Sequence, residues 1–99
     1  MIVLVIYPNH DGARFDSAYY RDHHAKLAQE VWQPERVELI EGQSMGGAPS
    51  PFALIAHFHF ASPEALGAAM ASPRRGELQA DIVNFTDIAP QVMIGRTLG

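Results

Sequence analysis

Side chains that could carry proton chemistry gather at two places in the sequence. Two tyrosines and two histidines lie within residues 19–24, and a second histidine pair, His57 and His59, is separated by one residue. A histidine titrates near neutral pH and can act as a general acid or base, while a nearby tyrosine can polarise an oxygen atom. We therefore take His24, Tyr20 and His59 as candidate catalytic residues.

The first group lies on a predicted helix that Asp16 caps and that ends near Trp32, before Pro34. At about 100° per residue, one side of this helix carries a mainly apolar stripe: Tyr20, His24, Leu27, Ala28 and Val31. Tyr20 and His24 then point inward, and Tyr19 and His23 flank them. The alternative for His24 is a core histidine whose hydrogen bond fixes the helix on the sheet.

The second group lies on a predicted strand, Phe52 to Phe60, whose two faces differ in character. One face carries Ala53, Ile55, His57 and His59, and the other carries Leu54, Ala56, Phe58 and Phe60. We expect the phenylalanines to pack under the helices, and Ile55 and His57 to line an apolar ligand pocket with Tyr7. The alternatives are histidines at a dimer interface or on a half-wet sheet, and a Tyr7 packed at the sheet rim.

A metal ion is a further possibility for the histidine pair, because neutral imidazole is a common metal ligand. Two histidines make half a site, however, and the sequence shows no evident third ligand. We therefore predict no metal ligand.

The remaining elements complete a β-α-β-β-α-β order. We expect a strand at Ile2–Tyr7 buried on both faces, a strand at Arg36–Gln43, a flexible connection at Gly42–Pro51, a helix starting at Ser62–Pro63, and a last strand at Ile88–Ile94 with an edge or bulge at Pro90. This order predicts the α+β, ferredoxin-like fold, a four-stranded antiparallel sheet with two helices on one face. The other face is apolar, so we expect two sheets to pair into a dimeric α/β barrel.

Composition narrows the possible functions. The length of 99 residues predicts a single domain, 1–99. Seven Lys and Arg against eleven Asp and Glu, without a basic stripe, disfavour nucleic acid and an anionic membrane surface as partners. Cysteine is absent, which excludes thiolate nucleophiles and fits a cytoplasmic protein. The apolar start is too short for a membrane span or a secretory signal.

Several stretches together resemble the EthD-like family of the dimeric α/β-barrel superfamily: Tyr7-Pro8, Phe15, Tyr19-Tyr20 with His24, Phe58-His59-Phe60, Ser62, and Asp81 with Asn84-Phe85-Thr86. The resemblance implies a homodimer with a pocket in each sheet, and a link to degradation pathways and oxidoreductase activity. Lys26 stands where the family usually has Pro, which suggests a more regular helix or a more polar pocket mouth.

These features lead to an expected function. It is a cofactor-independent oxidoreductase of the monooxygenase type, or an isomerase, acting on a small hydrophobic catabolic intermediate. One alternative is a non-catalytic ligand-binding or accessory dimer in a degradation pathway. The other is a metal- or haem-binding member of the superfamily.

Overall fold

Residues 1–99 are all described by the computed structural model, in which four antiparallel strands pair in the order β2-β3-β1-β4. The strands are β1 (Ile2–Pro8), β2 (Arg36–Glu41), β3 (Phe52–His59) and β4 (Gln91–Gly95). The helical elements are α1 (Ser17–Tyr19), η1 (Tyr20–His24), α2 (Ala25–Trp32), α3 (Pro63–Met70), α4 (Arg75–Asp81) and η2 (Ile82–Asn84). This arrangement confirms the predicted α+β, ferredoxin-like fold.

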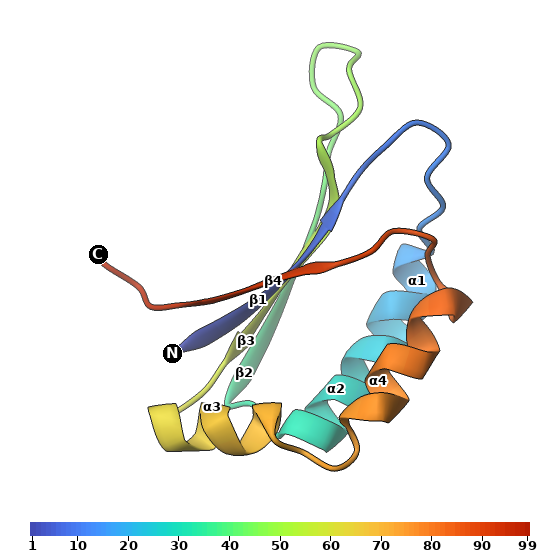
Figure 1. The fold of residues 1–99 in the computed structure, drawn as a ribbon. Helices are drawn as coiled ribbons and strands as arrows, with labels where there is room; N and C mark the ends of the chain where they lie inside the picture. The colour runs from blue at the N-terminus through green and yellow to red at the C-terminus, as the bar shows by residue number, and fades with distance from the viewer.

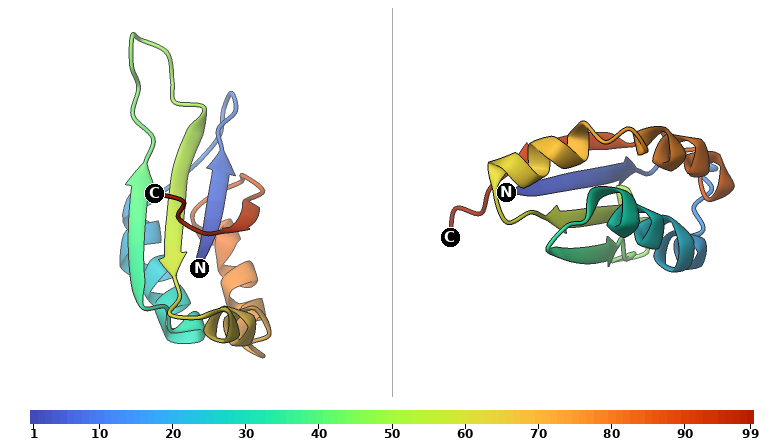
Figure 2. Two further views of the ribbon diagram at one scale, coloured as in Figure 1. Left: turned by 90° about the vertical axis from the view of Figure 1, so that its left-hand side faces the viewer. Right: turned by 90° about the horizontal axis from the view of Figure 1, so that it is seen from below.

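Helices α1, α2 and α4 lie on one side of the sheet and α3 lies across one end of it, whereas no helix covers the other side, where the C-terminal tail extends (Figure 1). Figure 2 shows this open face with the four strands side by side. On β3, Leu54, Ala56 and Phe58 are buried toward the helices, as the alternation predicted. The prediction that β1 is buried on both faces is wrong for the single chain, because Ile2, Leu4 and Ile6 on the open face are only half-buried.

Two strand boundaries differ by two residues or more from those expected. β2 ends at Glu41 rather than Gln43, and the loop that follows extends beyond the sheet, with Gly46 and Gly47 at positive φ of 68° and 83° (Figure 1). β4 begins at Gln91 rather than Ile88. The cause is Pro90, which has no N–H to donate to the ladder, so pairing starts only after it.

The first long helix is interrupted by one wide turn. Residues Tyr20–His24 form a π-helix, in which the Ala25 N–H donates to the Tyr20 carbonyl five residues earlier. The helix before Lys26 is therefore not a regular α-helix throughout. Tyr20 and His24 still point inward, as predicted, with exposed fractions of 1% and 6%. Single π turns inside helices often occur at functional sites.

None of the helices combines the length and the apolar character that crossing a membrane requires.

Candidate active site

Asp81, the last residue of α4, is the centre of a hydrogen-bonded group on the helical side of the sheet. Its carboxylate accepts from Nδ1 of His24 at 2.9 Å, from the hydroxyl of Tyr19 at 2.6 Å and from Nδ2 of Asn84 at 2.9 Å. The His24 and Asp81 side chains are 8% and 13% exposed. The contact is thus a largely buried histidine–carboxylate pair that joins the π turn to the end of α4.

Aromatic rings surround the other sides of the His24 imidazole. The ring centroid of Phe85 lies 4.6 Å from that of His24, and the Tyr20 centroid lies 5.0 Å away. Tyr7 from β1 packs edge-on against Tyr20 at 5.6 Å and against Phe15 at 5.1 Å. His24 therefore has a carboxylate on one side and an apolar, aromatic environment on the others.

This environment sets the charge of the pair. Burial lowers the pKa of His24 below its ordinary 6.5 and outweighs the opposing effect of Asp81. Burial, the largest influence on Asp81, raises its pKa, but the hydrogen bonds from Tyr19, Asn84 and His24 together bring it below 3.8. Near neutral pH the pair is therefore a neutral imidazole beside an ionised carboxylate.

The tautomer of His24 follows from this charge state. An ionised carboxylate only accepts hydrogen bonds, so Nδ1 carries the proton and Nε2 carries a free lone pair. Nε2 has no hydrogen-bond partner in the chain, so its lone pair is not used within the protein. A neutral imidazole with such a lone pair can act as a proton acceptor.

The two buried tyrosines stay protonated over the same pH range. Burial raises the pKa of Tyr7 to about 12 and raises that of Tyr20 well above 10. A neutral phenol is a hydrogen-bond donor. Both hydroxyls are therefore neutral hydrogen-bond donors near neutral pH.

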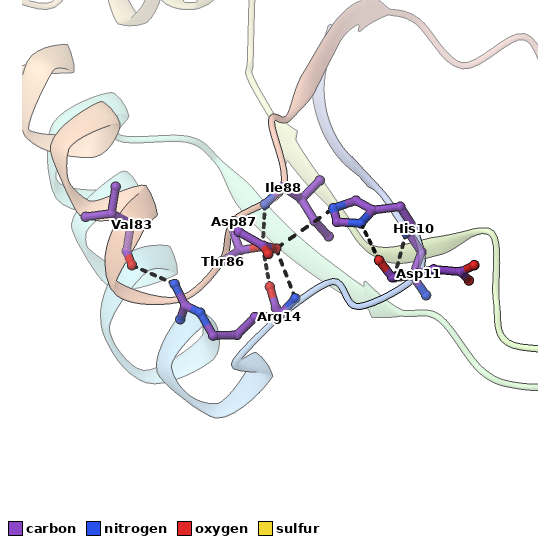
Figure 3. Close-up of polar contacts among 8 residues, drawn as sticks. His10, Asp11, Arg14, Val83, Thr86, Asp87 and Ile88 are labelled. Atoms are coloured by element: carbon purple, nitrogen blue, oxygen red, sulfur yellow. Dashed lines mark hydrogen bonds and ion pairs between the residues drawn. The ribbon is translucent and has the colours of Figure 1, made fainter.

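A second set of hydrogen bonds holds the segment after α4 against the loop before α1 (Figure 3). The Thr86 hydroxyl donates to the Arg14 carbonyl at 2.6 Å and accepts from the Ile88 N–H at 3.0 Å. The Arg14 N–H donates to the Asp87 carboxylate at 3.0 Å, and its guanidinium donates to the Val83 carbonyl at 2.9 Å. These bonds tie together segments about 70 residues apart and so fix the position at which α4 meets the π turn.

Two of the three predicted pocket residues lie on the open face of the sheet. Ile55 and His57 of β3 pair with Ile6 and Leu4 of β1. Tyr7 pairs with Leu54 instead, and is buried on the helical face with 1% exposure. The structure therefore does not bring Tyr7 together with Ile55 and His57 in one pocket.

His59 is likewise separated from the His24 pair by the sheet. Its Nε2 lies 2.7 Å from Oε1 of Glu38, a residue of the neighbouring strand β2. The predicted catalytic residues thus fall into two groups, Tyr20 and His24 on the helical face and His59 on the open face. Tyr7 belongs with the first group, where its hydroxyl lies close enough to Tyr20 for each to influence the pKa of the other.

Sequence reasoning missed two residues of these groups, Asp81 and Glu38. Asp81 appeared only within the family-like stretch, without a role, and Tyr19 was placed as a flanking residue although its hydroxyl binds Asp81. The family-like run Asp81 to Thr86 was the one available signal for Asp81. No sequence signal pointed to Glu38, because its position opposite His57 depends on the register between β2 and β3.

Comparison with known proteins identifies the family. Residues 12–89 match the model of the EthD domain. The chain is 33% identical over 85 residues to an uncharacterised 11.0 kDa protein encoded in the thcB–thcC intergenic region of Rhodococcus erythropolis, an alignment that covers 84% of this chain and 81% of that protein.

Solved structures agree with this match. An EthD-like protein from Ralstonia eutropha JMP134 is 35% identical, with a TM-score of 0.87 over 99% of this chain and 91% of that one. An EthD family protein from Bacillus halodurans C-125 shares the fold at 18% identity, with a TM-score of 0.74 over 98% of this chain and 97% of that one. The chain belongs to the EthD family.

Proposed function

We propose that the protein is a small acid–base enzyme that acts, without a cofactor, on a hydrophobic catabolic intermediate. The observation that supports this most strongly is the His24–Asp81 pair, in which a buried carboxylate holds a neutral imidazole with Nε2 free to accept a proton. The aromatic side chains around the imidazole suit an apolar substrate. General-base catalysis by a positioned histidine contributes about 10²–10⁴-fold to a rate.

In the proposed reaction, Nε2 of His24 takes a proton from an acidic C–H or O–H group of the substrate. Asp81 stabilises the resulting imidazolium, as a carboxylate beside a catalytic histidine does. Tyr20 or Tyr7 donates a hydrogen bond to the substrate oxygen that gains negative charge. Return of the proton to a different substrate atom gives isomerisation. Alternatively, the carbanion adds dioxygen to form a carbon–oxygen bond, takes the proton back from His24 to give a hydroperoxide, and loses water to leave a carbonyl group, with the substrate itself supplying the electrons.

The test is turnover of candidate quinols and lactones by the purified protein. His24→Gln removes the base, and His23→Gln is the matched control, because His23 is an exposed histidine on the same helical turn. We expect His24→Gln to reduce kcat by at least about 10²-fold while His23→Gln retains the rate. Equal loss in both variants, or in neither, would remove His24 from the mechanism.

We further propose that the protein acts as a homodimer whose open sheet faces pack together. The open face carries half-buried apolar residues on β1 and β3 and the exposed Ile40 and Met93, at 53% and 52%. A face of this kind on a soluble domain marks an interaction surface. Sedimentation at micromolar concentration should give twice the 10.9 kDa chain mass, and Ile55→Glu should shift the protein to monomer.

A non-catalytic role in binding the same apolar ligand is the second candidate. It is favoured by the tight packing around His24, whose hydrogen bond to Asp81 also fixes the helix in place. Native mass spectrometry that detects a co-purifying hydrophobic molecule, together with no turnover of any candidate substrate, would favour this role over catalysis.

A further inference from the structure

We propose that Glu38, His57 and His59 form a binding site for a divalent transition-metal ion such as Zn²⁺ on the open face of the sheet. Each residue offers one ligand atom, and these three atoms all lie within 4.8 Å of one another. Two imidazole nitrogens and one carboxylate oxygen are a ligand set that such ions bind in proteins.

The strand register brings the three side chains together. Glu38 of β2 pairs directly with His57 of β3, so both side chains point to the same face. His59 follows two residues later on β3 and therefore shares that face. The carboxylate already contacts Nε2 of His59 at 2.7 Å, and the two imidazole centroids are 6.3 Å apart. Rigid strands thus supply all three ligands, without any contribution from a loop.

The ligand atoms need only a small adjustment to bind an ion. Zn–N and Zn–O bonds are about 2.0–2.2 Å, so the ligands of a tetrahedral ion lie roughly 3.3 Å apart. The separations are all within 4.8 Å, and the His57 side chain is only half-buried, so its rotation can bring its ligand atom to this spacing. Three protein ligands leave a fourth position for water or for an oxygen atom of a bound molecule.

A positive charge already lies against these atoms. Nη2 of Arg36 is 3.5 Å from Oε1 of Glu38 and 3.3–3.4 Å from the ring nitrogens of His59. The Arg36 side chain is 64% exposed, and it can swing into solvent when an ion binds. The guanidinium therefore competes with the ion, and its removal should strengthen metal binding.

This site is independent of the proposed acid–base centre, because it lies on the open face, whereas Tyr20, His24 and Asp81 lie on the helical face. The open face is also the one through which we propose that the homodimer forms, so the ion would lie at the dimer interface. Metal binding can therefore fail while acid–base activity persists, and the reverse also holds. The two proposals are separated by measuring Zn²⁺ binding and turnover on the same variants.

The test is isothermal titration of tag-free, full-length protein with Zn²⁺, supported by the visible spectrum of the Co²⁺ form. We expect one ion per chain, and more than about ten-fold weaker binding for His57→Ala and for Glu38→Gln. The control is His23→Ala, which removes an exposed histidine outside the cluster and should leave binding unchanged.

Arg36→Ala provides a test that loss of folding cannot imitate, because the predicted change is several-fold tighter binding. The proposal is overturned if Zn²⁺ does not bind, or if His57→Ala binds as tightly as wild type while circular dichroism shows both folded. Unchanged or weaker binding by folded Arg36→Ala would also overturn the assignment of these three ligands.

Discussion

Asp81→Ala tests whether the buried hydrogen bond between His24 and Asp81 stabilises the fold more than an exposed ion pair does. It removes three hydrogen bonds at once, but they do not contribute equally. Asn84 is exposed and Tyr19 is only half-buried, so water replaces the carboxylate for both. The bond to His24 is different, because that side chain is 8% exposed and its Nδ1 donor loses its partner inside the protein.

The magnitude follows from the His24 bond. A hydrogen bond to a charged group contributes about 1.5–3 kcal/mol, and the partial exposure of Asp81 reduces this through solvent screening. Alanine is a better helix former than aspartate by roughly half a kcal/mol, which offsets part of the loss at the end of α4. We expect the free energy of unfolding to fall by about 1–2 kcal/mol, equivalent to a Tm decrease of about 4–16 °C in a domain of this size.

The assay is urea unfolding followed by circular dichroism at neutral pH. The control is Asp22→Ala, which removes an exposed carboxylate that pairs with the adjacent Arg21, and which should leave the unfolding midpoint almost unchanged. A midpoint for Asp81→Ala as close to wild type as that of Asp22→Ala would refute the reasoning. A second readout is the pKa of His24, which should fall further once Asp81, which raises it, is gone.

Three further predictions follow from packing and charge. The pKa of His24 in the folded chain lies below 6.5, so the unfolded chain binds a proton at this residue first as the pH falls. The urea concentration at the unfolding midpoint should therefore decrease as the pH is lowered from about 7 toward 5. His24→Gln should weaken this pH dependence. Phe85→Ala, at a fully buried ring, should cost roughly 3–5 kcal/mol; an equal effect from Phe52→Ala, which is 40% exposed, would contradict the packing described. Gly42→Ala would drive a Cβ into the Phe52 carbonyl oxygen and should lower the Tm strongly. Gly67→Ala, with open space in α3, should instead raise stability by roughly 0.5–1 kcal/mol; the opposite order of Tm values would refute this.

The fold could be predicted because local signals agreed with one another. The alternation on β3 separated Phe58 from His57 and His59, and Ser62 with Pro63 marked the start of α3, where the Ser62 hydroxyl accepts from the Ala65 N–H at 3.1 Å. The stripe on the first long helix placed Tyr20 and His24 inward. Each of these signals spans a few residues, so no knowledge of distant contacts was needed.

The composition of the site depended on contacts between distant residues, and these could not be predicted. Asp81 is 57 residues from His24, and nothing local to either residue specifies their contact. Tyr7 was assigned to the face of His57 because Ile2–Tyr7 is apolar throughout and shows no alternation. The register, in which Tyr7 pairs with Leu54, decides that face and is set only when the strands pair.

The protonation state of His24 tests the central claim most directly. Nitrogen-15 NMR, with the His24 signals assigned by comparison with His24→Gln, reports both the neutral tautomer and the titration midpoint. The structure predicts a neutral imidazole protonated at Nδ1, with a midpoint below 6.5. A proton on Nε2, or a midpoint at or above 6.5, would contradict the account of His24 as a base oriented by Asp81.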